Sequence, residues 1–266
     1  MKLATKTFVV TGAGSGIGRE LTLQLLQKGA NVAGVDINSS SLLETGRVAG
    51  LGEDRFKAFD LDITSQEAVN RLPGTVTKHF GTVDGIINNA GIIQPFKPVY
   101  DLSIEDINRV MNVNFFGTLY LTKAFLPLFL QRPEAHITNI SSMGGFLAVP
   151  GQTLYGASKA AVKIFTEGLY AELMETNVGV TVVFPGAIAT NITENSGLGK
   201  PKASGDAKMK PLAADKAAGQ ILTAIERNRF RVVVGPDAKF LDILYRFNPR
   251  YATQFIQQKM KSLLKP

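Results

Sequence analysis

The sequence predicts an α/β fold in which helices cover both faces of a doubly wound parallel sheet. Short β-branched and aromatic runs alternate with helical patterns along the chain, and this alternation is typical of parallel strands joined by right-handed crossovers. A glycine-rich turn also follows the first of these runs and opens a helix. The 266 residues, 45% of them apolar, can bury a large core, and no linker divides them. We therefore expect a single domain over residues 1–266.

The predicted elements follow one another in order along the chain. The run from Thr7 to Val10 reads as the first strand, and apolar residues at helical spacing then indicate a helix that reaches Gly29. After Pro236, apolar residues at helical spacing predict two amphipathic helices, broken at Pro249, in a C-terminal extension over residues 237–266. Between these ends, strands are predicted at residues 31–35, 56–59, 84–87, 135–140 and 179–184, and helices at 39–49, 65–80, 103–130 and 152–176.

The first turn, with the sequence TGAGSGIG at residues 11–18, lies between a strand and a helix. Gly12, Gly16 and Gly18 permit a tight turn and let backbone N–H groups approach a pyrophosphate, while the helix N-terminus adds donors and a favourable dipole. A flexible turn is the alternative interpretation. The strand before the turn and the helix after it favour a Rossmann-like dinucleotide site.

Asp36 ends the second predicted strand, at the offset where an acidic group can bond a ribose 2′-hydroxyl. A 2′-phosphate would be repelled there, and neither Ser15 nor Ile37 offers the positive charge that it needs. Asp36 therefore favours NAD over NADP. The alternative is that this carboxylate only caps the helix that follows.

Further polar segments follow predicted strands, at the sheet edge where ligands of parallel sheets bind. Asp62 comes after the third strand and the segment NNAG at residues 88–91 after the fourth, although such residues also occur in plain turns. Asn114 lies in an otherwise apolar helix, where a buried asparagine needs hydrogen-bond partners. Two loops, residues 141–146 and 185–190, fall on the same edge.

Tyr155 and Lys159 are four residues apart in a predicted helix, so they lie on one face, one turn apart. A free tyrosine has a pKa of about 10, and a nearby positive charge favours the phenolate. The pair is therefore suited to acid–base chemistry. Alone, a pair at this spacing more often belongs to a solvated helix face, so the interpretation depends on the other motifs.

Composition excludes several classes of function. The chain has no cysteine, which excludes disulfides, thiolate metal sites and cysteine nucleophiles, and His79 and His136 belong to no ligand cluster, so we expect no metal. The net charge of +7 is concentrated in residues 237–266, which hold six basic and two acidic side chains, so no nucleic-acid surface is expected. Neither a signal peptide nor a membrane span is recognised, and we expect a cytoplasmic protein.

Together these motifs resemble those of the short-chain dehydrogenase/reductase family, in its single-domain, NAD-preferring form. The resemblance extends from residue 5 to about residue 235. Its motifs are TGAGSGIG at 11–18, the strand-end Asp36, DIT at 62–64, NNAG at 88–91, VNFFG at 113–117, ISS at 140–142, YGASK at 155–159 and PGAIAT at 185–190.

The resemblance implies a set of catalytic roles. Tyr155 is expected to be the general acid/base, and Lys159 to lower its pKa and to bond the nicotinamide ribose. Ser142, chosen over Ser141 because it stands thirteen residues before the tyrosine, is expected to hold the substrate oxygen. Asn114 is expected to fix a water that links Lys159 to solvent.

The resemblance also implies NAD as the cofactor, with NADP less favoured. By this resemblance, Asp36 would contact the adenosine ribose, Asp62 the adenine and Thr190 the carboxamide of the nicotinamide. The expected cofactor contacts are Gly12, Ser15, Gly16, Ile17, Gly18, Asp36, Asp62, Ile63, Asn88, Ala90, Gly91, Tyr155, Lys159, Pro185, Gly186, Ile188 and Thr190.

The implied activity is hydride transfer between the nicotinamide cofactor and a hydrophobic secondary alcohol or ketone. The alternative is a regulatory protein that binds NAD(H) on the same fold without catalysis. Residues 191–213 are long and irregular, and we expect a substrate lid there. The expected substrate walls are Met143, Phe146, Leu147, Val149, Leu154 and Ile188, with Gln152 as a polar contact.

Two predictions concern partners. Helices 103–130 and 152–176 are expected to pair between subunits of a homodimer or homotetramer, through apolar residues that one sheet face does not cover. The C-terminal extension is expected to dock on the catalytic domain or on a sister subunit, and a peripheral contact with anionic lipid is the alternative. The apolar residues expected to be exposed for pairing are Phe125, Leu128, Phe129, Ile164 and Leu169.

Overall fold

The computed structural model describes residues 1–199 and 210–260. Its main sheet has seven parallel strands in the order β3-β2-β1-β4-β5-β6-β9. The sequence had not indicated the last strand, which is only four residues long. The strands are β1 (Thr7–Thr11), β2 (Asn31–Asp36), β3 (Phe56–Asp60), β4 (Gly85–Asn88), β5 (Ala135–Ile140), β6 (Val178–Pro185) and β9 (Arg231–Val234).

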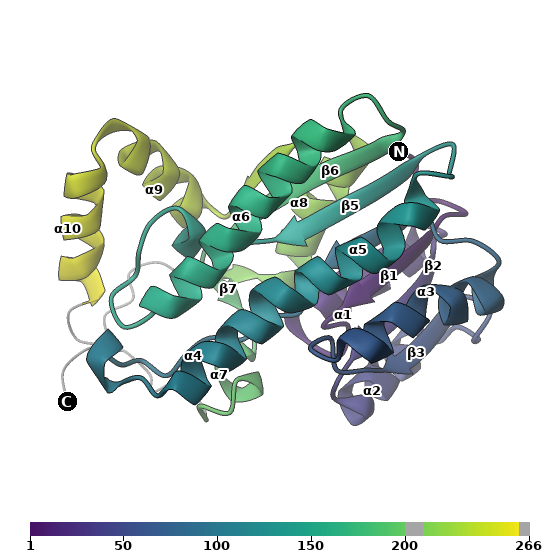
Figure 1. Cartoon of the computed structure of the whole chain (residues 1–266), viewed down its shortest axis with the longest axis horizontal. Coiled ribbons are helices and arrows are strands. Elements are labelled where there is room, and N and C mark those ends of the chain that lie inside the picture. Colours follow the sequence, from purple (N-terminus) through teal and green to yellow (C-terminus); the bar gives the residue numbers. More distant parts are fainter. Residues whose placement is uncertain (200–209, 261–266) are drawn as a thin grey trace.

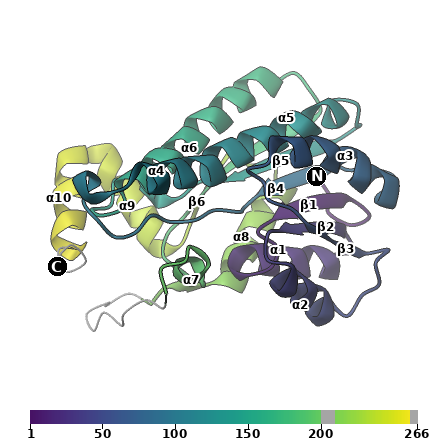
Figure 2. The ribbon, with the colours of Figure 1, turned by 60° about the horizontal axis from the view of Figure 1, so that its bottom comes forward.

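Helices cover both faces of this sheet, as Figures 1 and 2 show. On one face lie α1 (Gly16–Gln27), α2 (Ser39–Ala49) and α8 (Ala214–Glu226), and on the other lie α3 (Gln66–Phe80), α4 (Ile104–Met111), α5 (Gly117–Phe129) and α6 (Thr153–Leu173). Because both faces are covered, the central strands β1 and β5 are buried along their whole length instead of having one exposed face. The predicted doubly wound α/β fold is confirmed.

Two apolar layers hold the helices to the sheet. On the first face, Leu21 and Leu25 of α1 and Ile221 of α8 are fully buried against Phe8. On the second face, α5 contributes Phe125 and Phe129, whose stacked rings lie 5.9 Å apart between centroids. Burial of this kind is the main favourable term in folding, so these layers fix where each strand ends and hence where the polar loops meet.

The segment predicted as one helix over residues 103–130 is interrupted. A π-helical turn, Asn112–Phe116, separates α4 from α5 while the backbone stays helical on both sides. Such turns are rare and occur mostly at functional sites. This one contains Asn114, which is completely buried.

The apolar residues expected to pair subunits are mostly core residues, which corrects that expectation. Phe125, Phe129 and Leu169 are buried in the second layer, and Leu128 is half-buried. Only Ile164 is exposed, at 62%. Strand residues and α3 pack around these side chains and cover more of the two helices than the spacing of apolar residues suggested.

The C-terminal part adds a small sheet and a helical pair. Strand β7 (Ile188–Ala189), just before the predicted lid, pairs in parallel with β8 (Leu212–Ala213) at the end of the lid, and the lid also contains α7 (Ile192–Asn195). Helices α9 (Pro236–Phe247) and α10 (Pro249–Met260) follow β9. Residues 200–209 of the lid and 261–266 of the extension lie outside the described residues.

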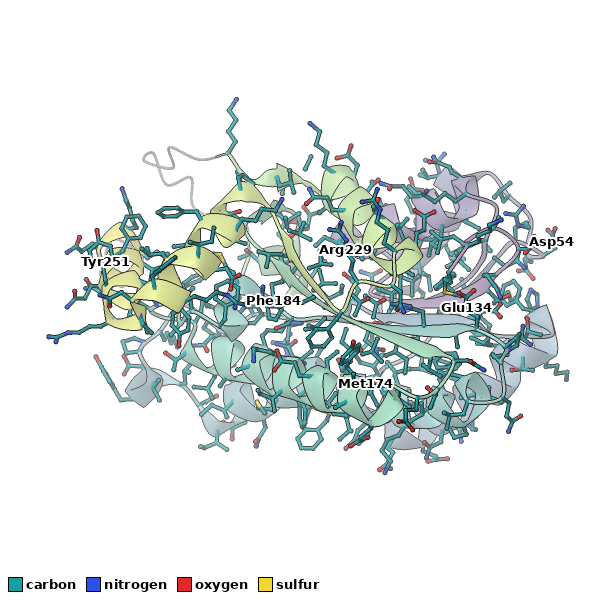
Figure 3. All side chains as sticks on the ribbon, turned by 90° about the horizontal axis from the view of Figure 1, so that it is seen from above. Asp54, Glu134, Met174, Phe184, Arg229 and Tyr251 are labelled. Atoms are coloured by element: carbon teal, nitrogen blue, oxygen red, sulfur yellow. The ribbon has the colours of Figure 1, made fainter. Side chains whose placement is uncertain are left out.

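The helical pair packs on the body of the domain. Leu241, Ala252 and Ile256 form a third apolar cluster with Leu147, which follows β5. Figure 3 shows this pair, marked by Tyr251, at the end of the molecule opposite Asp54. None of the helices in the described ranges is long and apolar enough to cross a membrane.

Candidate active site

One cleft of about 1020 Å³ gathers most of the predicted site residues. It lies at the carboxyl ends of the strands, where the order reverses between β1 and β4, which is the usual ligand position in such sheets. The predicted residues that line it are Gly12, Ser15, Gly16, Ile17, Asp36, Asp62, Ile63, Ala90, Gly91, Ser142, Tyr155, Lys159, Pro185, Gly186, Ile188 and Thr190.

Three predicted residues do not line the cleft. The Asn88 side chain donates to Asn139 and Thr122 inside the sheet layer, and its neighbour Asn89 lines the cleft instead, because successive residues at a strand end face opposite ways. Gly18 faces Gly12, since a Cβ on it would collide with the Gly12 carbonyl oxygen. Asn114 lies behind the cleft wall, in the π-helical turn.

The glycine turn between β1 and α1 fits a dinucleotide. Gly12 and Gly16 have φ of +67° and +52°, a conformation that favours glycine, so backbone N–H groups can face the cleft without side chains in the way. A Cβ on Gly12 would also lie 2.8 Å from Nδ2 of Asn89. The open backbone and the start of α1 together form the kind of anion cradle that phosphate groups occupy.

Asp36 is placed by the same turn. One carboxylate oxygen accepts a hydrogen bond from the Gly14 N–H at 2.8 Å, and the other accepts one from the Asn38 N–H at 2.9 Å. The N-cap of α2 is Asn38, whose side chain accepts from the Ser41 N–H. Asp36 therefore does not cap the helix itself, and its half-buried carboxylate retains lone pairs that face the cleft.

Tyr155 lies in the first turn of α6, and a residue that the sequence did not single out fixes that turn. The Gln94 side-chain oxygen accepts hydrogen bonds from the N–H groups of Leu154 and Tyr155, at 2.7 and 3.0 Å. Its Nε2 donates to the Gly151 carbonyl at 3.0 Å. Gln94 thus supplies the cap of α6 from sixty residues upstream, and no local pattern signals this role.

Of the two neighbouring serines, Ser142 is the one that contacts the hydroxyl of Tyr155. Ser142 lines the cleft and is a hydrogen-bond partner of the Tyr155 side chain, whereas Ser141 is buried and donates to the Lys159 carbonyl at 2.7 Å. Loss of hydration raises the pKa of Tyr155 above its ordinary value, and the bond with Ser142 opposes this rise. In this structure the phenol therefore keeps its proton at neutral pH.

Lys159 is 4% exposed, and its Nζ donates to the Ile140 carbonyl at 2.9 Å. Burial lowers the pKa of Lys159 from 10.5 to about 8. Its Nζ lies 6.0 Å from the centroid of the Tyr155 ring. Burial thus sets the direction of the pKa shift of Tyr155, and the lowering expected from Lys159 stays a prediction.

Asn114 organises the wall next to Lys159. Its side chain accepts from the Ile92 N–H, donates to the Ile92 carbonyl and donates to Ser158, all within 2.9 to 3.0 Å. A Cβ on Gly91 would lie 3.1 Å from Lys159 Nζ and 3.2 Å from Asn114 Oδ1. The π-helical turn thus holds the strand-end loop close to the lysine.

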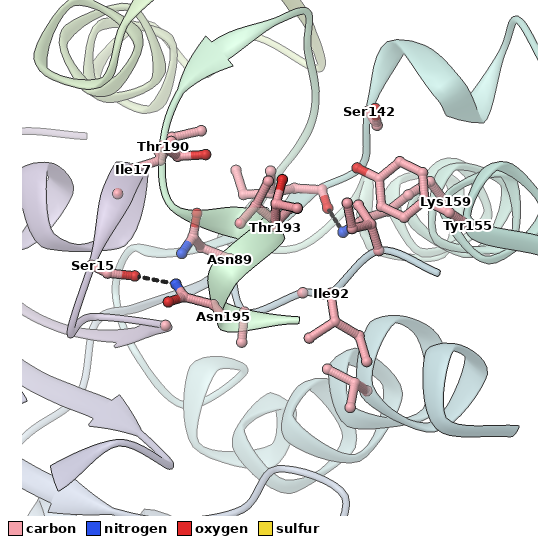
Figure 4. A pocket seen from close by; sticks show the side chains of 18 of the residues that line it. Ser15, Ile17, Asn89, Ile92, Ser142, Tyr155, Lys159, Thr190, Thr193 and Asn195 are labelled. Carbon is pink, nitrogen blue, oxygen red and sulfur yellow. Dashed lines mark hydrogen bonds between the residues drawn. The ribbon is translucent and has the colours of Figure 1, made fainter. Parts of the chain in front are cut away.

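The first part of the predicted lid closes onto the cleft. Asn195 of α7 donates to the Ser15 hydroxyl at 2.8 Å, across the glycine turn, and the Ser196 hydroxyl accepts from the Ile93 N–H at 3.0 Å. Figure 4 shows Ser15 and Asn195 at one end of the cleft and Ser142, Tyr155 and Lys159 at the other. The sequence had not indicated Asn195.

Only some of the residues expected to form the substrate walls line the cleft. Met143, Val149, Ile188 and Gln152 line the cleft, and Leu154 does not. Phe146 and Leu147 pack in the third apolar cluster with the C-terminal helices. Met260, at the end of α10, lines the cleft in their place, and only the tertiary packing of α10 reveals it.

Within residues 1–199 and 210–260, no group of three or more His, Asp or Glu side chains is arranged to hold a metal ion. His136 is buried in β5, where its Nε2 pairs with the Thr181 hydroxyl at 2.8 Å.

Known proteins share both the sequence pattern and the fold. The family described as short chain dehydrogenase matches residues 6–200. A putative oxidoreductase, SadH, of Mycobacterium tuberculosis is 39% identical over 250 residues, which cover 91% of this chain and 90% of that protein. An uncharacterized oxidoreductase of Staphylococcus aureus is 38% identical over 191 residues, which cover 72% of this chain and 81% of that protein.

Two solved structures are similar over nearly the whole chain. A short chain dehydrogenase/reductase from Burkholderia phymatum in complex with NAD gives a TM-score of 0.85 at 25% identity, covering 94% of this chain and 96% of that chain. A short chain dehydrogenase from Burkholderia cenocepacia in complex with NADP gives 0.79 at 28% identity, covering 100% of both. Both dinucleotides therefore occur among the structural relatives.

Proposed function

Because the chain belongs to the short-chain dehydrogenase family, whose members are oxidoreductases, we propose that it transfers a hydride between NAD(H) and a hydrophobic secondary alcohol or its ketone. The observation that carries this proposal is that Ser142, Tyr155 and Lys159 line the same cleft as Asp36 and the glycine turn. An acid–base group and a dinucleotide cradle in one cleft are the two parts that such a reaction needs.

The chain's own residues divide the work. Asp36 and the glycine turn would hold the adenosine end of the cofactor, and Lys159 would bond the nicotinamide ribose. Ser142 would hold the substrate oxygen beside Tyr155, whose hydroxyl gives a proton to a ketone oxygen or takes one from an alcohol. Asn114 would support this end by fixing the loop at Gly91. The bound cofactor supplies or accepts the hydride.

The raised pKa of Tyr155 bears on the direction of reaction. A phenol that keeps its proton at neutral pH is ready to protonate a ketone oxygen. The raised pKa of Tyr155 therefore supports reduction of a ketone as the easier direction. Oxidation requires the phenolate, and a positive charge near the ring favours it. Lys159, with a pKa of about 8, still carries that charge at neutral pH.

The preference for NAD rests on the charges around the adenosine end. The Asp36 carboxylate would accept from ribose hydroxyls and would repel a 2′-phosphate. Arg19 stands on α1 beside this turn, but its guanidinium donates to the carbonyls of Gly14 and Ser41 and to the Thr45 hydroxyl. These bonds hold the guanidinium in place, so it supports the turn and does not offer a phosphate site.

We propose that subunits pair through α5 and α6 to give a homodimer or homotetramer. The exposed apolar residues on and beside these helices are Phe116 at 36%, Leu130 at 49% and Ile164 at 62%. Light scattering at micromolar concentration should give a multiple of the chain mass, and Ile164→Glu should reduce it, because the new charge would be desolvated at the interface. A monomeric wild type contradicts the pairing.

The C-terminal extension is proposed to dock on its own domain near the substrate mouth. The burial of Leu241, Ala252 and Ile256 and the position of Met260 in the cleft wall support this over a membrane surface. Truncation after Gly235 should therefore lower the solubility of the protein, and the full-length chain should not bind vesicles. Salt-sensitive binding of the full chain to anionic vesicles would support the lipid alternative instead.

The experiment that tests the proposed activity follows absorbance at the NADH band during incubation with a panel of ketones, and with NAD and the matching alcohols. Turnover of at least one secondary alcohol or ketone pair is expected. NADH binding without turnover of any compound would contradict the proposal and support a regulatory NAD(H)-binding protein.

A further inference from the structure

A buried amide in the cleft wall lacks a hydrogen-bond partner for its oxygen. Gln152 lines the cleft and is 4% exposed, and it stands three residues before Tyr155, nearly one helical turn away on the same side of α6. Its Nε2 donates to the Gln94 carbonyl at 2.8 Å. Its Oε1 has no partner among the described residues.

The orientation of this amide follows from its neighbour. A backbone carbonyl can only accept, so the nitrogen of the Gln152 amide must face the Gln94 carbonyl and the oxygen must face away from it. Gln94 is itself held by three bonds to Gly151, Leu154 and Tyr155. The two glutamines therefore fix Oε1 of Gln152 as an acceptor next to the catalytic turn.

Burial of a hydrogen-bond acceptor lowers the stability of the folded protein unless a donor bonds to it. Buried polar atoms in folded proteins nearly always have a partner, because an unpaired amide oxygen loses its bonds to water. The apolar side chains of Met143, Val149 and Met260, which share the cleft, carry no N–H or O–H group. A donor on a bound molecule would complete the bonding of this group.

We infer that Gln152 accepts a hydrogen bond from the substrate, so that the physiological alcohol or ketone carries a second hydrogen-bond donor, a hydroxyl group, besides the reacting oxygen. This inference rests on the proposed function and narrows its substrate class. The substrate is then mainly apolar, with one hydroxyl that Gln152 reads while Ser142 and Tyr155 hold the reacting oxygen. A site that hydrogen-bonds a substrate hydroxyl rejects the analogue without that hydroxyl far more strongly than an apolar pocket discriminates between apolar groups.

The test compares matched ketones. Cyclohexanone is set against three cyclohexanones that carry a hydroxyl one, two or three carbons from the carbonyl carbon, and against the methyl ether of each. In the wild type, at least one hydroxyketone should have a kcat/KM at least about tenfold above both its methyl ether and cyclohexanone. In Gln152→Leu this ratio should fall to about one, whatever the substitution costs both compounds.

Gln94→Leu is the matched control. This substitution removes the Gln94 amide and disturbs the same turn of α6, but it leaves the Gln152 side-chain oxygen in place. It should therefore lower kcat/KM for both the hydroxyketone and its methyl ether, and the ratio of the two kcat/KM values should stay above one. A second readout is the affinity of the NADH-saturated enzyme for the corresponding diol and its monomethyl ether, measured by calorimetry, which should show the same preference without turnover.

The outcomes separate this inference from the proposed function. Turnover of cyclohexanones with no preference for a hydroxyl at any position, or a preference that Gln152→Leu leaves intact, overturns the inference and leaves the dehydrogenase activity standing. Absence of turnover with every carbonyl and alcohol tested overturns both.

Discussion

The side-chain oxygen of Gln94 accepts a hydrogen bond from the backbone N–H of Tyr155 at 3.0 Å. The bond joins the loop after β4 to the first turn of α6, so the position of the catalytic phenol depends on a residue that has no chemical role of its own. A helix N-terminus leaves several N–H groups without partners, and this glutamine satisfies two of them.

Gln94→Leu should therefore lower kcat by at least about tenfold with little change in the dissociation constant of NADH. Two N–H groups lose their acceptor, each at a cost of about 1–3 kcal/mol, and a small shift of a catalytic group is expensive in rate. Gln94→Glu keeps an acceptor and should recover most of the loss. Equal kcat values for Gln94→Leu and the wild type would show that the bond does not position Tyr155.

Tyr155→Phe should reduce kcat by at least about 10²-fold, because it removes the proton that a placed acid or base contributes while the ring remains. NADH affinity should change little. Tyr170→Phe is the matched control, since Tyr170 lies on the same helix and packs on Phe230 at 4.2 Å between ring centroids. A Tyr155→Phe variant with more than a few per cent of wild-type kcat contradicts the assignment.

Lys159 gives a prediction about pH. Its pKa is lowered to about 8, so the ammonium that would bond the ribose is present at pH 7 and lost as the pH rises through about 8. NADH affinity should weaken over that interval, and Lys159→Met should bind NADH poorly without this pH dependence. Lys163→Met is the control, because Lys163 pairs with Glu167 one turn further along α6. A pH-independent wild type would rule out this role for the charge.

Asp36 and Ile37 give a prediction about cofactor choice. The double substitution Asp36→Ser with Ile37→Arg should shift the ratio of kcat/KM toward NADPH by at least about tenfold, since the 2′-phosphate would meet a positive charge in place of a negative one. Asp60→Asn, on the neighbouring strand β3, should leave the ratio unchanged. A wild-type enzyme that already prefers NADPH would contradict the proposal that Asp36 repels the 2′-phosphate.

The sequence was sufficient for the fold and for the edge of the sheet where the site lies. Alternating strand and helix patterns are local, and the carboxyl ends of parallel strands must meet at one edge. The sequence alone could therefore place the glycine turn, Asp36 and the Tyr155 turn at the same edge of the sheet. Strand β9 was missed although it is as long as β4; it lies at the edge of the sheet and is mostly half-buried, so it lacks the fully buried run that marks β4.

The remaining features depend on tertiary structure. Asn88 and Asn89 differ by one residue in register, and only the strand end decides which of them faces the cleft. The π-helical turn contains Asn114, whose side chain bonds Ile92 in a contact between distant segments. The Gln94 cap and the Met260 wall are likewise contacts across long sequence separations, which periodicity cannot indicate.

The most direct test of hydride transfer uses NADH that carries deuterium on one face of C4 of the nicotinamide, with a ketone that the enzyme reduces. One of the two deuterated forms should place deuterium on the carbinol carbon of the product alcohol, measured by mass spectrometry, and the other should place none, because the cleft holds the ring in one orientation. Alcohol that forms with no deuterium from either form would contradict the central claim that this cleft moves a hydride between NAD(H) and its substrate.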